Sequence, residues 1–399
     1  MTEAFRRDSR MNTFAIHLFI DAWPCGWMKS IMDVLRIPKK AYFAYRDALT
    51  PLMVSLRTDR RTYFAGEKIQ MEAWICNDTH EVPAGAQLRY QLEIAGKIVQ
   101  SGRALAKVPR CSSQPQGFIR FALPELAQRT SATVRLALTG KSGKVLFDTA
   151  QEIEIFPKAS TPVSKRAFIV GGRSGRAAAL AVELGLTPIF RCAPKSTDVI
   201  LVDDMEKFAA QEAAVKLAVV AGGTAVLLEL PVGGHSILGD AVKVVPGGMG
   251  ARHFVDCGTG NDLVADFKPY DFWFWHDSSA GHPTPLLEAV LESEPDGWNA
   301  ILESGNGTWK NDWKPVPAAI EKSFGEGVIR ICQVKLVNRT RTNPVAAMFV
   351  RNLLNLDCLA AKSPTNGHDQ HLNIGSSRSP VSKFETNAVV LQSKRQPSS

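Results

Sequence analysis

The first segment of the chain combines an apolar run with a helical pattern. The apolar run at 14–22 predicts a buried strand, and residues 2–11 are expected to form the end of a helix. Residues 41–50 place apolar groups at helical spacing, and Pro51 is expected to stop that helix. The pattern therefore predicts one strand followed by one helix before residue 52.

From Leu52 to Pro157 the period changes to two, with apolar and polar residues alternating in short runs. The expected strands lie at 52–56, 69–75, 87–94, 118–123, 132–138 and 151–156, and turn residues separate them at 65–67, 77–78, 95–97 and 140–143. Short alternating strands at this spacing are typical of an antiparallel β-sandwich of immunoglobulin type. We therefore predict such a sandwich at 52–157.

Beyond a linker at 158–165, strands and helices alternate. The expected strands are 167–170, 197–202, 224–230 and 327–334, and the expected helices are 175–185, 205–219 and 344–356. Continuous β-branched runs between helices indicate a parallel, doubly wound sheet with both faces buried. We assign residues 166–360 to this α/β domain and predict a disordered tail at 361–399, which is rich in Ser, Asn, Pro and Gln.

Three stretches resemble the C-terminal part of glycoside hydrolase family 2. Phe-Ala-Ile-His-Leu-Phe-Ile-Asp-Ala-Trp-Pro-Cys-Gly-Trp at 14–27, with the helix after it, resembles the last strand–helix unit of the family's catalytic (β/α)8 barrel. Tyr-Phe-Ala-Gly-Glu and Trp-Ile-Cys-Asn-Asp, at 63–67 and 74–78, resemble the sandwich that follows that barrel. Residues 298–354 resemble the flavodoxin-like or amidotransferase-like domain at the end of some of these enzymes.

The resemblance implies a region of an enzyme that hydrolyses β-glycosides with retention, a reaction that needs two carboxyl groups about 5 Å apart. In the family both are glutamates on barrel strands that this chain lacks, so we assign no catalytic residue and expect the chain alone to be inactive. Residues 1–51 would be the remnant of the barrel. The expected partners are carbohydrate, in a complete enzyme, and a polypeptide that carries the rest of the barrel.

The resemblance also implies two substrate-binding residues. Asp21 and Trp23 lie at the end of the expected barrel strand, where barrel active sites form. Trp23 could stack on a sugar ring and Asp21 could bond hydroxyl groups; the alternative, which we favour, is that both only hold the loop. An alternative class of function is a non-catalytic module that binds sugar or completes a partner's barrel.

Nucleotide binding by the α/β domain is a further alternative. Gly172 and Gly175 fit the last two glycines of a dinucleotide fingerprint, whereas Val170 stands at the first position. Arg191 lies at the end of the strand that follows this turn and its helix, where a partner of a nucleotide 2′-phosphate would lie. A tight strand-to-helix turn that needs no ligand explains the same glycines and is favoured.

The densest aromatic cluster is Asp-Phe-Trp-Phe-Trp-His at 271–276. Together with Trp298, Trp309 and Trp313 it could line a sugar-binding surface, although packing in the core or between domains is favoured. If the segment were a strand, Phe272 and Phe274 would face one side, and Trp273 and Trp275 the other.

Composition excludes several classes of function. The net charge of +8 is spread along the chain, without the concentrated basic patch of a nucleic-acid-binding protein. Seven cysteines without C-x-x-C spacing favour neither zinc nor redox chemistry, and they favour a reducing, cytoplasmic environment. No leading apolar segment and no membrane-spanning run is visible. We therefore expect no cofactor, metal, nucleic acid or membrane.

Overall fold

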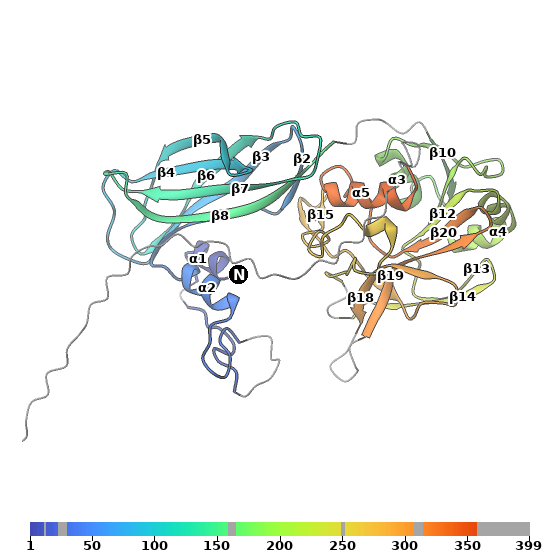
Figure 1. Cartoon of the computed structure of the whole chain (residues 1–399), viewed down its shortest axis with the longest axis horizontal. Coiled ribbons are helices and arrows are strands. Elements are labelled where there is room, and N and C mark those ends of the chain that lie inside the picture. Colours follow the sequence, from blue (N-terminus) through green and yellow to red (C-terminus); the bar gives the residue numbers. More distant parts are fainter. Residues whose placement is uncertain (12, 23–29, 159–164, 249–251, 307–313, 357–399) are drawn as a thin grey trace, which may run out of the picture. The chain divides into compact units, whose positions relative to one another are not determined.

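Residues 52–156 form two β-sheets that pack face to face (Figure 1). The computed structural model describes residues 1–11, 13–22, 30–158, 165–248, 252–306 and 314–356. One sheet has the order β1-β3-β6, and its strands are Leu52–Arg57, Lys68–Asn77 and Ser112–Ala122. The other has the order β2-β8-β7-β4-β5, and its strands are Thr62–Phe64, Val145–Phe156, Thr130–Thr139, Gln87–Ile94 and Lys97–Leu105. The β-rich character predicted for this region is confirmed: its strands pair in antiparallel fashion, except that β2 pairs in parallel with β8.

Alternation decides which side chains of the five-stranded sheet reach solvent. On β7, Ala132, Val134 and Leu136 are buried between the sheets, while Thr133 and Arg135 lie on the opposite face. Successive side chains of a strand point to opposite faces, so the apolar half of the alternating pattern forms the core. The polar half becomes an outer surface, which forms the floor of the groove described below.

The second part of the chain is built on a seven-stranded sheet of order β10-β9-β11-β12-β20-β19-β18. The first five strands in that order are parallel, and they are Thr187–Ile189, Arg166–Val170, Val199–Val202, Thr224–Leu228 and Gly327–Cys332. Helices α3 (Arg176–Glu183) and α5 (Pro344–Leu353) pack on one face, and α4 (Met205–Val220) packs on the other (Figure 1). Both faces are therefore covered, which explains the continuous apolar runs.

Several strands of this part carry no strong alternating signal and were not predicted. Strands β19 (Lys314–Phe324) and β18 (Asn299–Asn306) extend the large sheet in antiparallel fashion. Smaller sheets comprise β13 (Gly233–Ile237), β14 (Asp240–Pro246) and β17 (Ala289–Leu291), and β15 (His276–Asp277) with β16 (His282–Pro283). A short 3-10 helix spans Asp262–Val264.

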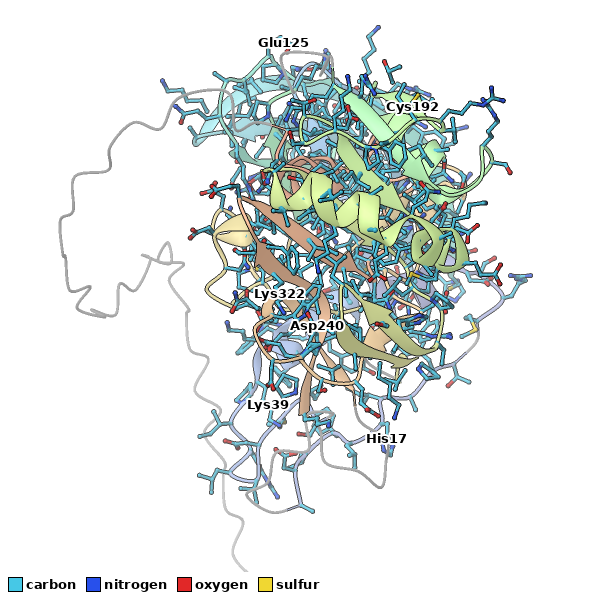
Figure 2. All side chains as sticks on the ribbon, turned by 90° about the vertical axis from the view of Figure 1, so that its right-hand side faces the viewer. His17, Lys39, Glu125, Cys192, Asp240 and Lys322 are labelled. Atoms are coloured by element: carbon cyan, nitrogen blue, oxygen red, sulfur yellow. The ribbon has the colours of Figure 1, made fainter. Side chains whose placement is uncertain are left out.

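A buried tryptophan and an ion pair connect the small sheet to the large one. Lys322 on β19 lies 2.7 Å from Asp240 at the start of β14, and Figure 2 labels both residues. The Asp240 carboxylate also accepts a hydrogen bond from the indole of Trp298 at 3.0 Å. Trp298 therefore packs in the core rather than on a sugar-binding surface.

The N-terminal segment departs from the prediction. Helices α1 (Thr2–Arg7) and α2 (Lys40–Ala48) lie close to the predicted positions, and α2 ends before Pro51. The strand expected at 14–22 is wrong: its described residues form only one isolated bridge, Ile20 with Met32, and they are mostly exposed. A strand gains stability from the hydrogen bonds of its neighbours, and no neighbouring strand extends along this segment in the described structure. The predicted tail at 361–399 lies outside the described residues.

Candidate functional site

Asp21 is buried in a hydrogen-bonded cluster with Ser30 and Lys39. Lys39 Nζ lies 2.7 Å from Asp21 Oδ2 and 2.6 Å from Ser30 Oγ, and Ser30 donates to the other carboxylate oxygen. The bonds from Lys39 and Ser30 lower the pKa of Asp21. The carboxylate thus holds two parts of the N-terminal segment together. Trp23 lies outside the described residues, so sugar contact by these two residues stays a prediction.

The glycine-rich turn after β9 is filled by a carboxylate. Asp203, directly after β11, accepts a hydrogen bond from the backbone N–H of Ala177 in the first turn of α3, at 2.8 Å. A Cβ atom added at Gly171 or Gly175 would collide with the Asp203 carboxylate, which explains these two glycines without a ligand.

This arrangement speaks against the nucleotide alternative. A negative charge at a helix N-terminus is favourable, and a dinucleotide would place its pyrophosphate at that same position. Asp203 would repel it. A Cβ atom at Gly172 would meet no close neighbour, and Arg191 is exposed in the loop after β10. Neither residue therefore forms a contact in the described structure that would offset this repulsion. Binding through Gly172, Gly175 and Arg191 remains an untested prediction that this geometry disfavours.

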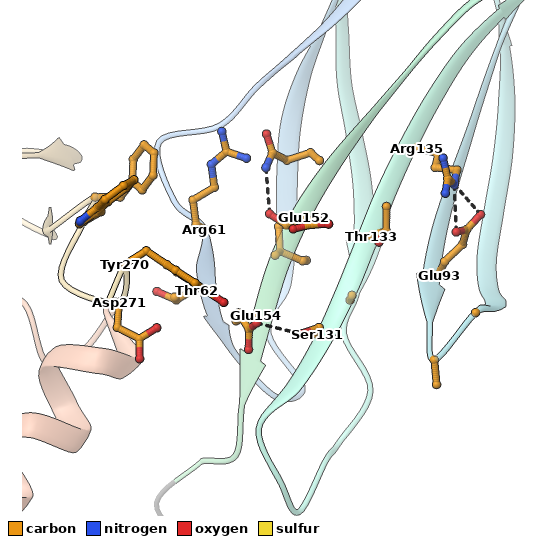
Figure 3. A pocket seen from close by; sticks show the side chains of 17 residues that line it. Arg61, Thr62, Glu93, Ser131, Thr133, Arg135, Glu152, Glu154, Tyr270 and Asp271 are labelled. Carbon is orange, nitrogen blue, oxygen red and sulfur yellow. Dashed lines mark hydrogen bonds and ion pairs between the residues drawn. The ribbon is translucent and has the colours of Figure 1, made fainter. Parts of the chain in front are cut away.

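A groove of about 810 Å³ lies over the outer face of the five-stranded sheet (Figure 3). Its floor comes from β2, β8, β7 and β4 and from the turn after β4, and one wall comes from residues 270–274. Glu152 on β8 faces Thr133 on β7, which faces Glu93 on β4. Strand pairing therefore lines up one polar row across the floor.

Three aromatic side chains form the wall, and each is about half exposed. The exposed fractions are 49% for Tyr270, 48% for Trp273 and 46% for Phe274. Trp273 also contacts the exposed ring of Phe254, at 6.2 Å between centroids. Large aromatic side chains usually bury most of their surface, so exposed rings beside a groove indicate a binding surface.

Two neighbours of the wall anchor it in the core. Phe272 and Trp275 are fully buried and stacked at 5.7 Å, and the Trp275 indole donates to the carbonyl of Lys335 at 2.7 Å. Residues 271–275 form a turn rather than a strand, so the alternation that a strand would impose does not apply, and Phe272 and Trp275 lie together inside. Phe274 has a positive φ of 53°, a strained conformation for an aromatic residue of the kind that is often found at functional sites.

Arg61 and Glu152 are the unpaired charges of the groove. In the part of the chain that the structure describes, no hydrogen-bond partner meets the Arg61 guanidinium, and its Nε atom is buried. Its Cζ lies 5.2 Å from the centre of the Phe274 ring. Desolvation lowers the pKa of Arg61, and its electrostatic interactions with Tyr63, Glu3 and Glu152 act in the opposite direction. Figure 3 labels Arg61 and Glu152 in the groove. No described side chain pairs with the Glu152 carboxylate.

The other carboxylates of the groove are neutralised. Glu93 accepts from Arg135 Nε at 2.9 Å. Asp271 pairs with Arg129, and Glu154 pairs with both Arg129 and Lys268. Among the charged side chains of the lining, one donor, Arg61, and one acceptor, Glu152, therefore remain available, and their opposite charges sum to zero. This site suits an uncharged ligand that both donates and accepts hydrogen bonds and has an apolar face for the wall.

Sequence reasoning missed Arg61 and Glu152. The alternation of β8 predicts that Glu152 lies on the outer face, but Arg61 lies directly before a three-residue strand, Thr62–Phe64, that the pattern does not reveal. No group of three or more His, Cys, Asp and Glu side chains in the described ranges could hold a metal ion. Within those ranges, no helix is both long and apolar enough to cross a membrane.

Comparison with known proteins adds little to this geometry. No protein-family model matches the chain, and no curated protein sequence matches it. Spo0M, a sporulation control protein from Bacillus subtilis, is similar over 27% of this chain and 50% of its own, at 12% identity and a TM-score of 0.20. The CARDB domain of the PF1109 protein from Pyrococcus furiosus, solved with di-metal ions, is similar over 27% of this chain and 92% of its own, at 5% identity and a TM-score of 0.20.

Proposed function

We propose that this chain is a non-catalytic, carbohydrate-binding region of a glycosidase related to family 2. Carbohydrate binding is supported by one observation: Arg61 and Glu152, neither of which has a hydrogen-bonding side-chain partner in the described structure, line the same groove as the exposed ring of Trp273. A sugar hydroxyl can accept from the guanidinium and donate to the carboxylate, while the apolar face of the sugar ring stacks on the indole. A balanced pair of charges gives no preference for an ionic ligand.

The glycosidase part of the proposal rests on the sequence resemblance and on the order of the domains. The five parallel strands follow the order β10-β9-β11-β12-β20, which in chain order reads 2-1-3-4-5, the order of flavodoxin-like sheets. A sandwich followed by such a domain supports the expected arrangement. We expect the pure chain not to hydrolyse nitrophenyl β-glycosides, and turnover that disappears when one of its own carboxylates is replaced would contradict this.

Saccharide binding is tested by calorimetric titration of the full chain with neutral mono- and oligosaccharides. Trp273→Ala should abolish detectable binding, because stacking on an exposed ring is lost. Arg61→Met and Glu152→Gln should each weaken it about 10- to 100-fold, as expected for a lost hydrogen bond to a charged group.

Phe118 on β6 provides the matched control, since it is also 48% exposed but lies on the other sheet. Phe118→Ala should bind like the unmodified chain. Equal losses in Phe118→Ala and Trp273→Ala, or no binding of any neutral saccharide, would contradict the proposal.

Completion of a partner's barrel is a second candidate function. The N-terminal segment exposes large apolar side chains, with exposed fractions of 47% for Phe19, 75% for Leu35 and 57% for Ile37. A polypeptide that supplies strands could cover this surface and turn the segment into a paired strand. Co-purification with a barrel polypeptide, lost on Phe19→Ser, would support this role, and co-purification that this substitution leaves intact would contradict it.

A further inference from the structure

We infer that the groove binds a neutral oligosaccharide that runs across the strands, rather than a single sugar. This inference rests on the proposed carbohydrate binding and specifies its ligand. The lining comes from four neighbouring strands, β2, β8, β7 and β4, and from Ala95 and Gly96 in the turn beyond them. Neighbouring strands lie about 4.8 Å apart, so the floor extends for about 14 Å. That length exceeds one sugar ring.

The floor offers hydrogen-bonding groups along its whole length. Glu152 lies beside the aromatic wall, Thr133 lies opposite it on the next strand, and Glu93 follows on the third. In the described structure the Thr133 hydroxyl has no hydrogen-bond partner, and the Glu93 carboxylate is held by Arg135 at 2.9 Å. These groups are positioned to meet successive hydroxyl groups of one extended ligand.

The far end of the groove is open. A Cβ atom added at Gly96 would meet nothing within 4 Å, so the turn after β4 leaves room for a chain to continue. The aromatic wall stands only at the other end, on residues 270–274. We therefore assign the terminal unit of the ligand to the wall and its following units to the row of Thr133 and Glu93.

The charges of the groove define the ligand as neutral. Of the four carboxylates in the lining, Glu93, Glu154 and Asp271 are paired with basic groups. Arg61 and Glu152 both line the groove without an ion pair between them, and their opposite charges sum to zero. An acidic sugar chain would meet the carboxylates of the floor, and a basic one would meet Arg61 and Arg135, so an uncharged chain fits best.

The experiment is a length series measured by calorimetry on the full chain. The probes are the neutral cello-, manno- and galacto-oligosaccharides of one to four units, with oligogalacturonate and chitosan oligomers as the charged comparisons. We expect the Kd to fall about tenfold from one unit to three in at least one neutral series, because added units gain hydrogen bonds along the floor.

A blocking substitution locates the added units. Thr133→Tyr places a large ring in the middle of the floor, and it should remove the gain in affinity with ligand length. Ala137→Tyr is the matched control, because Ala137 lies on the same face of β7 but outside the groove lining. It should retain the full gain.

The possible failures are distinct. If single sugars bind as tightly as longer chains, or if Thr133→Tyr retains the gain, the oligosaccharide inference is wrong while the proposed carbohydrate binding stands. Tighter binding of either charged series overturns the assignment of a neutral ligand. If no saccharide binds at all, the proposed function fails and this inference fails with it.

Discussion

Two glutamates on β8, separated by one residue, have opposite surroundings. Glu154 lies at the junction of the sandwich and the second part of the chain, where it accepts hydrogen bonds from Arg129, Lys268 and Ser131 at 2.7–2.9 Å. Glu152 lies in the groove, where no described side chain pairs with it. Both point outward, because residues two apart share a face of the sheet.

The difference separates a structural site from a binding site. At the junction, Arg129 also makes two hydrogen bonds to Asp271, whose side chain is 1% exposed, and every carboxylate there has its partner within the protein. In the groove, an acceptor and a donor stay available beside exposed rings. A fully satisfied network contributes to stability, whereas unsatisfied groups in a cavity indicate an external partner.

The largest effect is expected from breaking the junction. Arg129→Ala should lower the free energy of unfolding by about 3–5 kcal/mol, because it leaves the buried carboxylate of Asp271 without its counter-charge. Urea denaturation followed by fluorescence would measure the change. The control is Arg57→Ala, which removes a more exposed ion pair, with Glu72, and should cost less than about 1 kcal/mol. Equal costs for the two substitutions would show that the junction is not a stabilising network.

A smaller effect is expected from Glu154→Gln, and it should depend on pH. Burial alone would raise the pKa of Glu154, but the bonds from Lys268, Ser131 and Arg129 lower it below its ordinary value of 4.5. Folding thus favours the charged form of Glu154. The contribution of this charge to the free energy of unfolding is complete above pH 4.5 and is lost as the pH falls through the lowered pKa.

We therefore expect Glu154→Gln to cost about 1–3 kcal/mol at about pH 7, and clearly less at about pH 3. Urea unfolding of both proteins at the two pH values is the measurement. If the substitution lowers the free energy of unfolding equally at both pH values, the charge of Glu154 does not contribute to stability.

The smallest effect on stability is expected from Glu152→Gln. Because Glu152 has no partner to lose, its replacement should change the free energy of unfolding by less than about 0.5 kcal/mol. The same variant should weaken saccharide binding, so stability and binding are separated in one protein. Thermal denaturation and saccharide titration of a single preparation would measure both quantities. A large loss of stability would show that Glu152 stabilises the fold and would contradict its assignment to the binding surface.

How far the sequence predicts the structure differs between the two parts. For β4 the predicted and observed bounds coincide, and the four apolar strand runs of the second part all lie in its parallel region. The run at 14–22 was equally apolar but forms no strand, because strand formation depends on neighbours that the local pattern does not contain. Gly172 and Gly175 fit part of a dinucleotide fingerprint in the sequence, but Asp203, from a distant position in the chain, fills the space beside Gly175.

The candidate site shows the same limit. The aromatic cluster at 271–276 is visible in the sequence, yet helical or strand periodicity could not say which rings are exposed, because a turn with a positive φ at Phe274 decides it. The sequence determined the alternation of β7 and β8 and hence a polar outer face. Only the tertiary structure brought Arg61 and residues 270–274 to that face and left Glu152 unpaired, since contacts between residues far apart in the chain depend on how the strands and loops pack together.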